Sequence, residues 1–143
     1  MINLTQTMLK DIAEELEMGM RAFIHKETQQ LLFVPDENKF DSMDFEPWIN
    51  DFELLEENCL DYFEIENWKS FEAFEMMTEF AEQLTNNAAL QNQLLEALNK
   101  RKPFREFKFV IDNEDEYRED WFAFKNNWQQ EYVRKKLIEL DEE

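Results

Sequence analysis

The chain of 143 residues is poor in the residues from which common active sites are built. It contains one glycine, one histidine, one cysteine and two serines, Ser42 and Ser70. Phosphate-cradling loops need several glycines, and zinc sites need histidine or thiolate clusters, so the composition excludes both. Neither serine stands in a Gly-flanked nucleophile turn. The sequence therefore predicts no catalytic residue of these kinds, no cofactor and no metal.

The single cysteine, Cys59, forbids an internal disulfide, which fits a reducing compartment. Cys59 and His25 have the chemistry of a nucleophile and a base, but nothing in the sequence brings them together, and we favour structural roles for both. No apolar run approaches the ~20 residues of a membrane span. Residues 1–5 lack the pattern of a signal peptide. We therefore expect a cytoplasmic protein that does not contact membranes.

Basic residues are also scarce, because 15 Lys and Arg face 34 Asp and Glu, for a net charge of −19. Such a balance argues against direct binding of DNA or RNA, which is driven by neutralising phosphates. The charge is uneven, with −17 in residues 1–99 and −2 in residues 100–143. The acidity therefore belongs to the first two thirds of the chain.

Apolar residues are plentiful, at 43 % of the chain with 15 % aromatic, which is ample for a core. Hydrophobic periodicity predicts an α+β fold in a single domain over residues 1–143, with a small three-stranded antiparallel sheet packed with about six helices. The expected elements begin with a helix around residues 8–16 ended by Gly19, a hairpin of residues 20–26 and 31–34, and a polar linker over 36–43. A helix after Asp44 and a third strand over 60–65 follow. The rest of the chain is expected to be helical, with helices after Ser70, after Asn86 or Asn87 and from Pro103, and a long C-terminal helix over about 117–140.

The last helix carries two apolar lines when it is drawn at 100° per residue. The first line is aromatic and consists of Tyr117, Trp121, Phe124, Trp128 and Tyr132. The second is mainly aliphatic and consists of Phe122, Val133, Leu137 and Leu140. Such a surface has to be covered, either by the core of the chain or by a partner, because aromatic groups are also common interface anchors. The sequence leaves both interpretations open.

One positive cluster interrupts the acidic background, with five cations among nine residues: Lys100, Arg101, Lys102, Arg105 and Lys108. The cluster can balance a helix C-terminus and the acidic surface, bind an anion, or dock an acidic partner or a second copy of the chain. The candidate contact surface combines these cations with nearby aromatic residues: Arg101, Pro103, Phe104, Arg105, Phe107, Lys108, Trp121, Phe124 and Lys125.

The C-terminal third also carries a family resemblance. Residues 98–108 read LNKRKPFREFK and residues 121–125 read WFAFK, which resembles the end of a bacterial family catalogued as uncharacterised protein family one-five-eight. Residues 9–19 (LKDIAEELEMG) and 71–77 (FEAFEMM) look similar as well. The resemblance covers nearly the whole chain but implies no function. It does imply a glycine at the hairpin tip, where this chain has Gln29.

Our leading functional hypothesis is a non-enzymatic interaction or regulatory protein that contacts an unknown protein partner, or itself as a homodimer, through the candidate surface. One alternative is an enzyme whose carboxylates, with or without a metal, are brought together only by the fold. Another is an acidic mimic of nucleic acid that competes for a DNA-binding protein.

Overall fold

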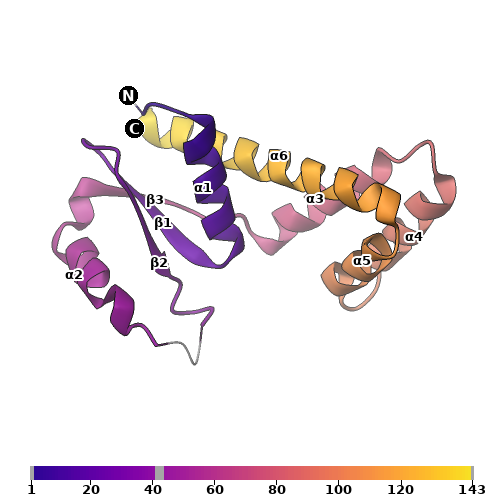
Figure 1. Cartoon of the computed structure of the whole chain (residues 1–143), viewed down its shortest axis with the longest axis horizontal. Helices are drawn as coiled ribbons and strands as arrows, with labels where there is room; N and C mark the ends of the chain where they lie inside the picture. Colours follow the sequence, from indigo (N-terminus) through magenta and orange to yellow (C-terminus); the bar gives the residue numbers. More distant parts are fainter. Residues whose placement is uncertain (1, 41–43, 143) are drawn as a thin grey trace. The chain divides into compact units, whose positions relative to one another are not determined.

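The computed structural model describes residues 2–40 and 44–142, so part of the predicted linker, residues 41–43, lies outside the described residues. Over the described part the chain forms six α-helices and one three-stranded antiparallel sheet of order β2-β1-β3, which confirms the predicted α+β fold (Figure 1). The elements are α1 (Gln6–Glu17), β1 (Met20–His25), β2 (Leu31–Pro35), η1 (Glu46–Trp48), α2 (Ile49–Glu57), η2 (Cys59–Asp61), β3 (Tyr62–Ile65), α3 (Ser70–Glu82), α4 (Ala88–Leu98), α5 (Pro103–Asp112) and α6 (Asp115–Asp141).

The contacts of the chain divide it into two compact units. The first, here called the sheet unit, contains the residues up to Asn67 and those from Gln129 onward; the second, the helical unit, runs from Trp68 to Trp128. Helix α6 therefore contributes residues to both. The net charge is −15 in the sheet unit and −4 in the helical unit. The single domain over residues 1–143 stays a prediction.

The first helix ends as the sequence predicts. Thr5 caps its start by accepting the backbone N–H of Met8 at 3.1 Å. At its end, Gly19 has a φ of +90° and its N–H donates to the carbonyl of Leu16 at 3.1 Å. A β-carbon at Gly19 would lie 3.2 Å from the Phe40 ring. The only glycine of the protein is therefore placed where a side chain is least tolerated.

Gly19→Ala is expected to lower the free energy of unfolding by about 1–2 kcal/mol, because it forces a left-handed backbone on a residue with a β-carbon and moves the Phe40 ring. Gly19→Asn is the matched control, since asparagine tolerates this conformation better than alanine. Urea unfolding followed by circular dichroism measures both. Equal stability of the alanine variant and the wild type would contradict the strained turn.

The hairpin tip carries the second left-handed residue. Gln29 has a φ of +61°, and its N–H donates to the carbonyl of His25 at 3.0 Å. This is the position at which the family resemblance implied glycine, and a positive φ is the physical reason for that expectation. Here the side chain of Gln29 adds a contact, since its amide oxygen accepts the backbone N–H of Asn3 at 2.9 Å.

Strand β1 is central and paired with both neighbours. Successive side chains of a strand point to opposite faces, so Ala22 and Ile24 share one face while Arg21 and Phe23 share the other. Ala22 and Ile24 are buried in the sheet unit's core, and α1, which packs on β1, contributes further buried residues: Leu9, Ile12, Ala13 and Leu16. Figure 1 shows α1 and α2 on either side of the sheet.

The end of α6 completes this core. Val133 and Leu137 are fully buried, and the hydroxyl of Tyr132 donates to the backbone carbonyl of Glu66 at 3.0 Å. The side chain of Gln6, at the start of α1, donates a hydrogen bond to that of Gln130. The second apolar line predicted for the last helix is thus mainly a core contact of the sheet unit.

The helical unit has a core of its own. Helix α4 begins at the predicted cap, because the side chain of Asn87 accepts the N–H of Leu90 at 3.1 Å. Phe80 on α3, Phe107 on α5 and Trp121 on α6 meet at ring distances of 4.9–6.5 Å. The remaining buried members are Met76, Ala81, Leu84, Leu90, Leu94, Leu98 and Ile111, and Tyr117, Phe124 and Trp128 pack against them half-buried.

Two details of the sequence interpretation were wrong. The third strand begins at Tyr62 rather than at Leu60, because residues Cys59–Asp61 form the turn η2 and Leu60 is exposed. On α3, the helical period predicts one apolar face, made of Ala73, Phe74, Met77, Phe80, Ala81 and Leu84. Phe74 is exposed, and Met76, which is not on that predicted face, is buried. Within residues 2–40 and 44–142, no helix is both long and apolar enough to cross a membrane.

Candidate functional site

Helix α5 has one face in the core and one face in solvent. Phe107 and Ile111 are fully buried, and they fix the inner face. On the outer face, Phe104, Lys108, Arg105 and Phe109 follow one another over an arc of about 140° at 100° per residue. Phe104 is 38 % exposed and Phe109 67 % exposed. Two aromatic rings and two cations therefore share the outer face.

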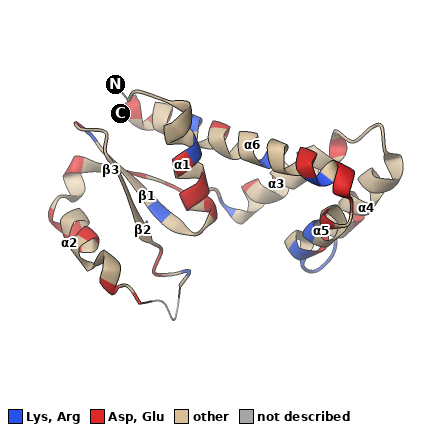
Figure 2. Cartoon of the chain, in the orientation of Figure 1, with Lys and Arg blue, Asp and Glu red and all other residues tan. Residues whose placement is uncertain are grey.

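The loop before α5 extends this charge. Lys100, Arg101 and Lys102 are all exposed, and Figure 2 shows blue segments gathered in this loop and at the start of the helix. We call the exposed residues of this loop and helix the α5 surface: Lys100, Arg101, Lys102, Phe104, Arg105, Lys108 and Phe109. Residues 100–108 hold five cations and one acid, a net charge of +4 in a chain of −19.

Among the described residues, ion-pair partners are found for two of the five cations. Lys100 and Arg105 both lie near Glu106, at 4.0 and 3.4 Å. For the other three, Arg101, Lys102 and Lys108, no carboxylate of the described residues lies within 4.0 Å. Ion pairs among the described residues therefore involve fewer than half of the five cations.

The helix dipole of α5 disfavours the position of one of these cations, Arg105. The N-cap of α5 is Lys102 and its first helical residue is Pro103, so Arg105 stands in the first turn. A helix N-terminus carries a partial positive charge and attracts acids rather than cations. The preceding helix α4 ends at Leu98, and nearby cations stabilise its C-terminus. Arg105, in contrast, is repelled by the partial positive charge at the N-terminus of its own helix. This arrangement favours a role toward a ligand or partner over a role in stability.

All nine residues of the predicted contact surface lie in the helical unit, but they do not share one surface. Arg101, Phe104, Arg105 and Lys108 are exposed, and Pro103 is half-buried beside them. Phe107 is fully buried and Trp121 is 5 % exposed, so neither has surface to offer a partner. Phe124 packs half-buried against the same core.

The remaining predicted residue, Lys125, belongs to a separate group on α6. Its ammonium lies 5.3 Å from the ring centre of Phe122, and the guanidinium of Arg118 lies 5.4 Å from the same ring. Phe122 is exposed between two cations, a smaller version of the pattern on α5. Of the aromatic line of α6, Trp121 is buried in the core of the helical unit, and Tyr117, Phe124 and Trp128 pack half-buried against that core. Tyr132, the last member of the line, is buried in the sheet unit instead.

Phe109 is the exposed residue that sequence reasoning missed. It stands two positions after Phe107, a rotation of about 200° on a helix, so the burial of one predicts the exposure of the other. The helical period of the sequence therefore already indicated that Phe109 is exposed. The family motif drew attention to Phe107 instead.

His25, for which the sequence favoured a structural role, has one in the hairpin. The Nδ1 atom of His25 accepts the backbone N–H groups of Glu27 and Thr28, each at 3.1 Å, and the ring lies edge-on to Tyr62 at 5.0 Å. His25 therefore organises the hairpin turn. Cys59 is a free, exposed thiol. Among the described residues, no group of three or more His, Cys, Asp or Glu side chains is arranged to hold a metal ion.

A family model described as Uncharacterised protein family (UPF0158) matches residues 2–142. The chain belongs to this family. Comparison with curated proteins and with solved structures found no match to it. Because the family description names no activity, the function of this UPF0158 member has to be sought in its own surface chemistry.

Proposed function

We propose that this UPF0158 member is a non-enzymatic, cytoplasmic interaction protein that docks an acidic partner protein on the α5 surface. The observation that carries the proposal is the combination of three cations that have no ion-pair partner among the described residues, Arg101, Lys102 and Lys108, with two exposed aromatic rings on a helix whose other face is core. The exposed thiol of Cys59 supports the cytoplasm, where cysteines stay reduced.

The composition of the α5 surface indicates what the partner offers. Arginine and aromatic side chains are the commonest anchors of protein interfaces, and they act best when they enter pockets that exclude water. Phe104 and Phe109 require apolar pockets, and the cations around them require carboxylates at the rim of those pockets. A partner segment with acidic residues flanking apolar ones meets both requirements. Charge complementarity of this kind also speeds association.

Several properties of the chain favour a protein partner over nucleic acid. The cluster of +4 is confined to nine residues, whereas the whole chain carries −19. A phosphate backbone would be repelled by the surrounding acids beyond the reach of the cluster. A compact acidic protein segment can instead be met by the cluster alone.

Photo-crosslinking at Phe109 tests the proposal. With benzoylphenylalanine in place of Phe109, irradiation of cells of the protein's own host is expected to join the chain to one predominant acidic protein. The matched control places the same crosslinker at Phe71, which is 61 % exposed on α3 of the same helical unit. The control is expected to yield no such adduct.

Three results would contradict the proposal. The first is an equal yield from positions 109 and 71, which would indicate nonspecific contact. The second is an adduct with nucleic acid. The third is an adduct of twice the chain mass, which would assign the α5 surface to a second copy of the chain rather than to a separate partner.

A further inference from the structure

The sheet unit contains a cavity on the face of the sheet opposite α1. It has a volume of about 640 Å³ and lies between β1 and β3 on one side and the segment of α2 on the other. Its size falls within the usual ~300–1,000 Å³ of small-molecule sites. No residue of α2 is buried, so the helix lines this space rather than filling it. The cavity is therefore a formed recess and not a packed core.

Four of the ten described residues that line the cavity are aromatic. Phe23 and Tyr62 stand on the sheet, and Phe45, Phe52 and Leu55 face them from the α2 segment. Faces of aromatic rings carry partial negative charge, so they attract a cation as well as an apolar body. This lining by itself permits neutral and cationic occupants.

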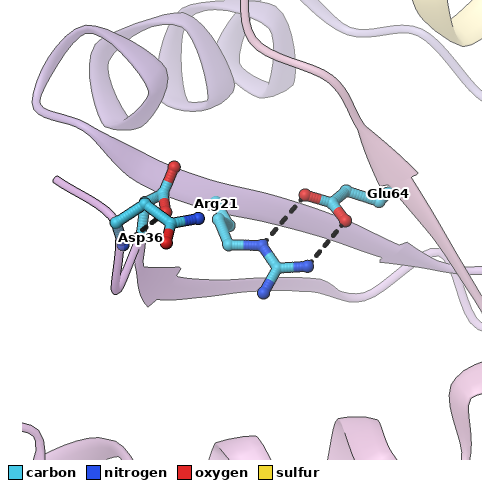
Figure 3. A network of polar contacts seen from close by, with 4 residues as sticks. Arg21, Asp36 and Glu64 are labelled. Carbon is cyan, nitrogen blue, oxygen red and sulfur yellow. Dashed lines mark hydrogen bonds and ion pairs between the residues drawn. The ribbon is translucent and has the colours of Figure 1, made fainter.

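The one cation at the cavity is already neutralised. Arg21 on β1 binds the carboxylate of Glu64 on β3 with two hydrogen bonds of 2.8 and 3.0 Å (Figure 3). The hydrogen bond that Arg21 donates to Glu64 and the charges of Glu64, Asp36 and Glu37 raise the pKa of Arg21 above its ordinary value, against the effect of burial. Arg21 stays charged and engaged, so it is not free to hold a ligand anion.

Two further carboxylates line the cavity and have no ion-pair partner in the part of the chain that the structure describes. Glu37 and Glu56 are exposed, and no Lys, Arg or His nitrogen of the described residues lies within 4.0 Å of either. Together with Glu64 and Arg21, they give the lining a net charge of −2, inside a unit of −15. An anion would be repelled at this site, and a cation attracted.

We propose that this cavity binds a small organic cation with an apolar body, held by the aromatic walls and by the carboxylates of Glu37 and Glu56. The class includes aryl and alkyl amines and ammonium compounds. The site lies entirely within the sheet unit and shares no residue with the α5 surface. It therefore stands or falls independently of the proposed docking function.

Three probes of one shape and different charge test the proposal on the full chain. They are phenylbutylamine, phenylbutanol and phenylbutyrate, titrated by calorimetry at neutral pH. The amine is expected to bind about fivefold more tightly than the alcohol, because an exposed carboxylate contributes up to about fivefold to the binding of a cation. Phenylbutyrate is expected to bind more weakly than the alcohol. Added salt weakens the binding of the amine and hardly affects that of the alcohol.

Variants of one helix locate the site. Glu56→Gln removes a lining carboxylate and is expected to weaken amine binding about three- to fivefold. Glu53→Gln is the matched control, because Glu53 is an exposed acid on the same helix that does not line the cavity. The control is expected to bind the amine like the wild type. Binding of phenylbutanol should be the same in all three proteins.

Cys59 provides a second readout, since it lines the cavity and is the only cysteine of the chain. Saturating amine is expected to slow alkylation of Cys59 by iodoacetamide. Phenylbutyrate binding as tightly as the amine would overturn the proposal. So would equal losses in the Glu56 and Glu53 variants, or no saturable binding of any probe up to about 10 mM.

Discussion

Phe107→Ala is expected to lower the free energy of unfolding of the helical unit by about 3–5 kcal/mol, the usual cost of removing a buried aromatic ring. Phe107 is 0 % exposed, and its ring lies 4.9 Å from that of Trp121 and 6.5 Å from that of Phe80. Its removal leaves a cavity bounded by α3 and α6, which rigid helices fill only in part. Urea unfolding followed by tryptophan fluorescence measures the loss, because Trp121 reports on this core.

Phe109→Ala is the matched control on the same helix. Phe109 is 67 % exposed, so its removal is expected to change stability by no more than about 0.5 kcal/mol. The two variants delete the same ring two positions apart, and only the burial differs. A loss above about 2 kcal/mol for Phe109→Ala would show that the outer face of α5 is covered within the chain, and it would remove the basis of the docking surface.

Local signals made much of the fold predictable. Gly19 ends a helix through a backbone conformation that few residues adopt, and Asn87 starts one through a short-range hydrogen bond. The cap formed by Thr5 at the start of α1 was not predicted. Pro103 sets the start of α5 because its missing N–H is not needed there. The hairpin followed from two apolar runs around a polar link. Each of these features depends on residues within a few positions of one another.

The faces of α3 and α5 were harder to assign, because several aromatic residues stand on each helix. Phe104, Phe107 and Phe109 all lie within one and a half turns, and only the packing of Trp121 and Phe80 against Phe107 decides which is inside. On α3 the same competition exposed Phe74 and buried Met76. The helical period relates the positions on one helix to each other, but the long-range partner decides which of them is buried.

The cavity of the sheet unit was not predictable at all. The apolar stripe of Trp48, Ile49, Phe52 and Leu55 is typical of an amphipathic helix. Helix α2 exists, but none of its residues is buried, and Phe52 and Leu55 line a recess. Amphipathicity shows which side of a helix faces inward, whereas it does not show whether the space behind that side is filled.

Charge reversal on the α5 surface tests the central claim that this surface binds a partner and is dispensable for folding. The partner for this test is the protein identified by crosslinking at position 109, in purified form. The double variant Arg105→Glu with Lys108→Glu is expected to raise the dissociation constant of this partner at least about 100-fold, because two attractive contacts become repulsive. Stability should not fall. The exposed Arg105–Glu106 pair contributes little, and an acid at position 105 suits the first turn of α5.

The matched control is Lys10→Glu with Lys135→Glu, two exposed cations of the sheet unit whose reversal changes the net charge equally. The decisive measurement is the dissociation constant of the partner for the three proteins, taken together with their thermal midpoints. We predict a loss of binding confined to the Arg105/Lys108 variant, with a midpoint within about 2 °C of the wild type. Unchanged affinity of the Arg105/Lys108 variant, or an equal loss of affinity in the control, would contradict the account. A thermal midpoint lowered by about 5 °C or more would also contradict it and would indicate that these cations stabilise the fold.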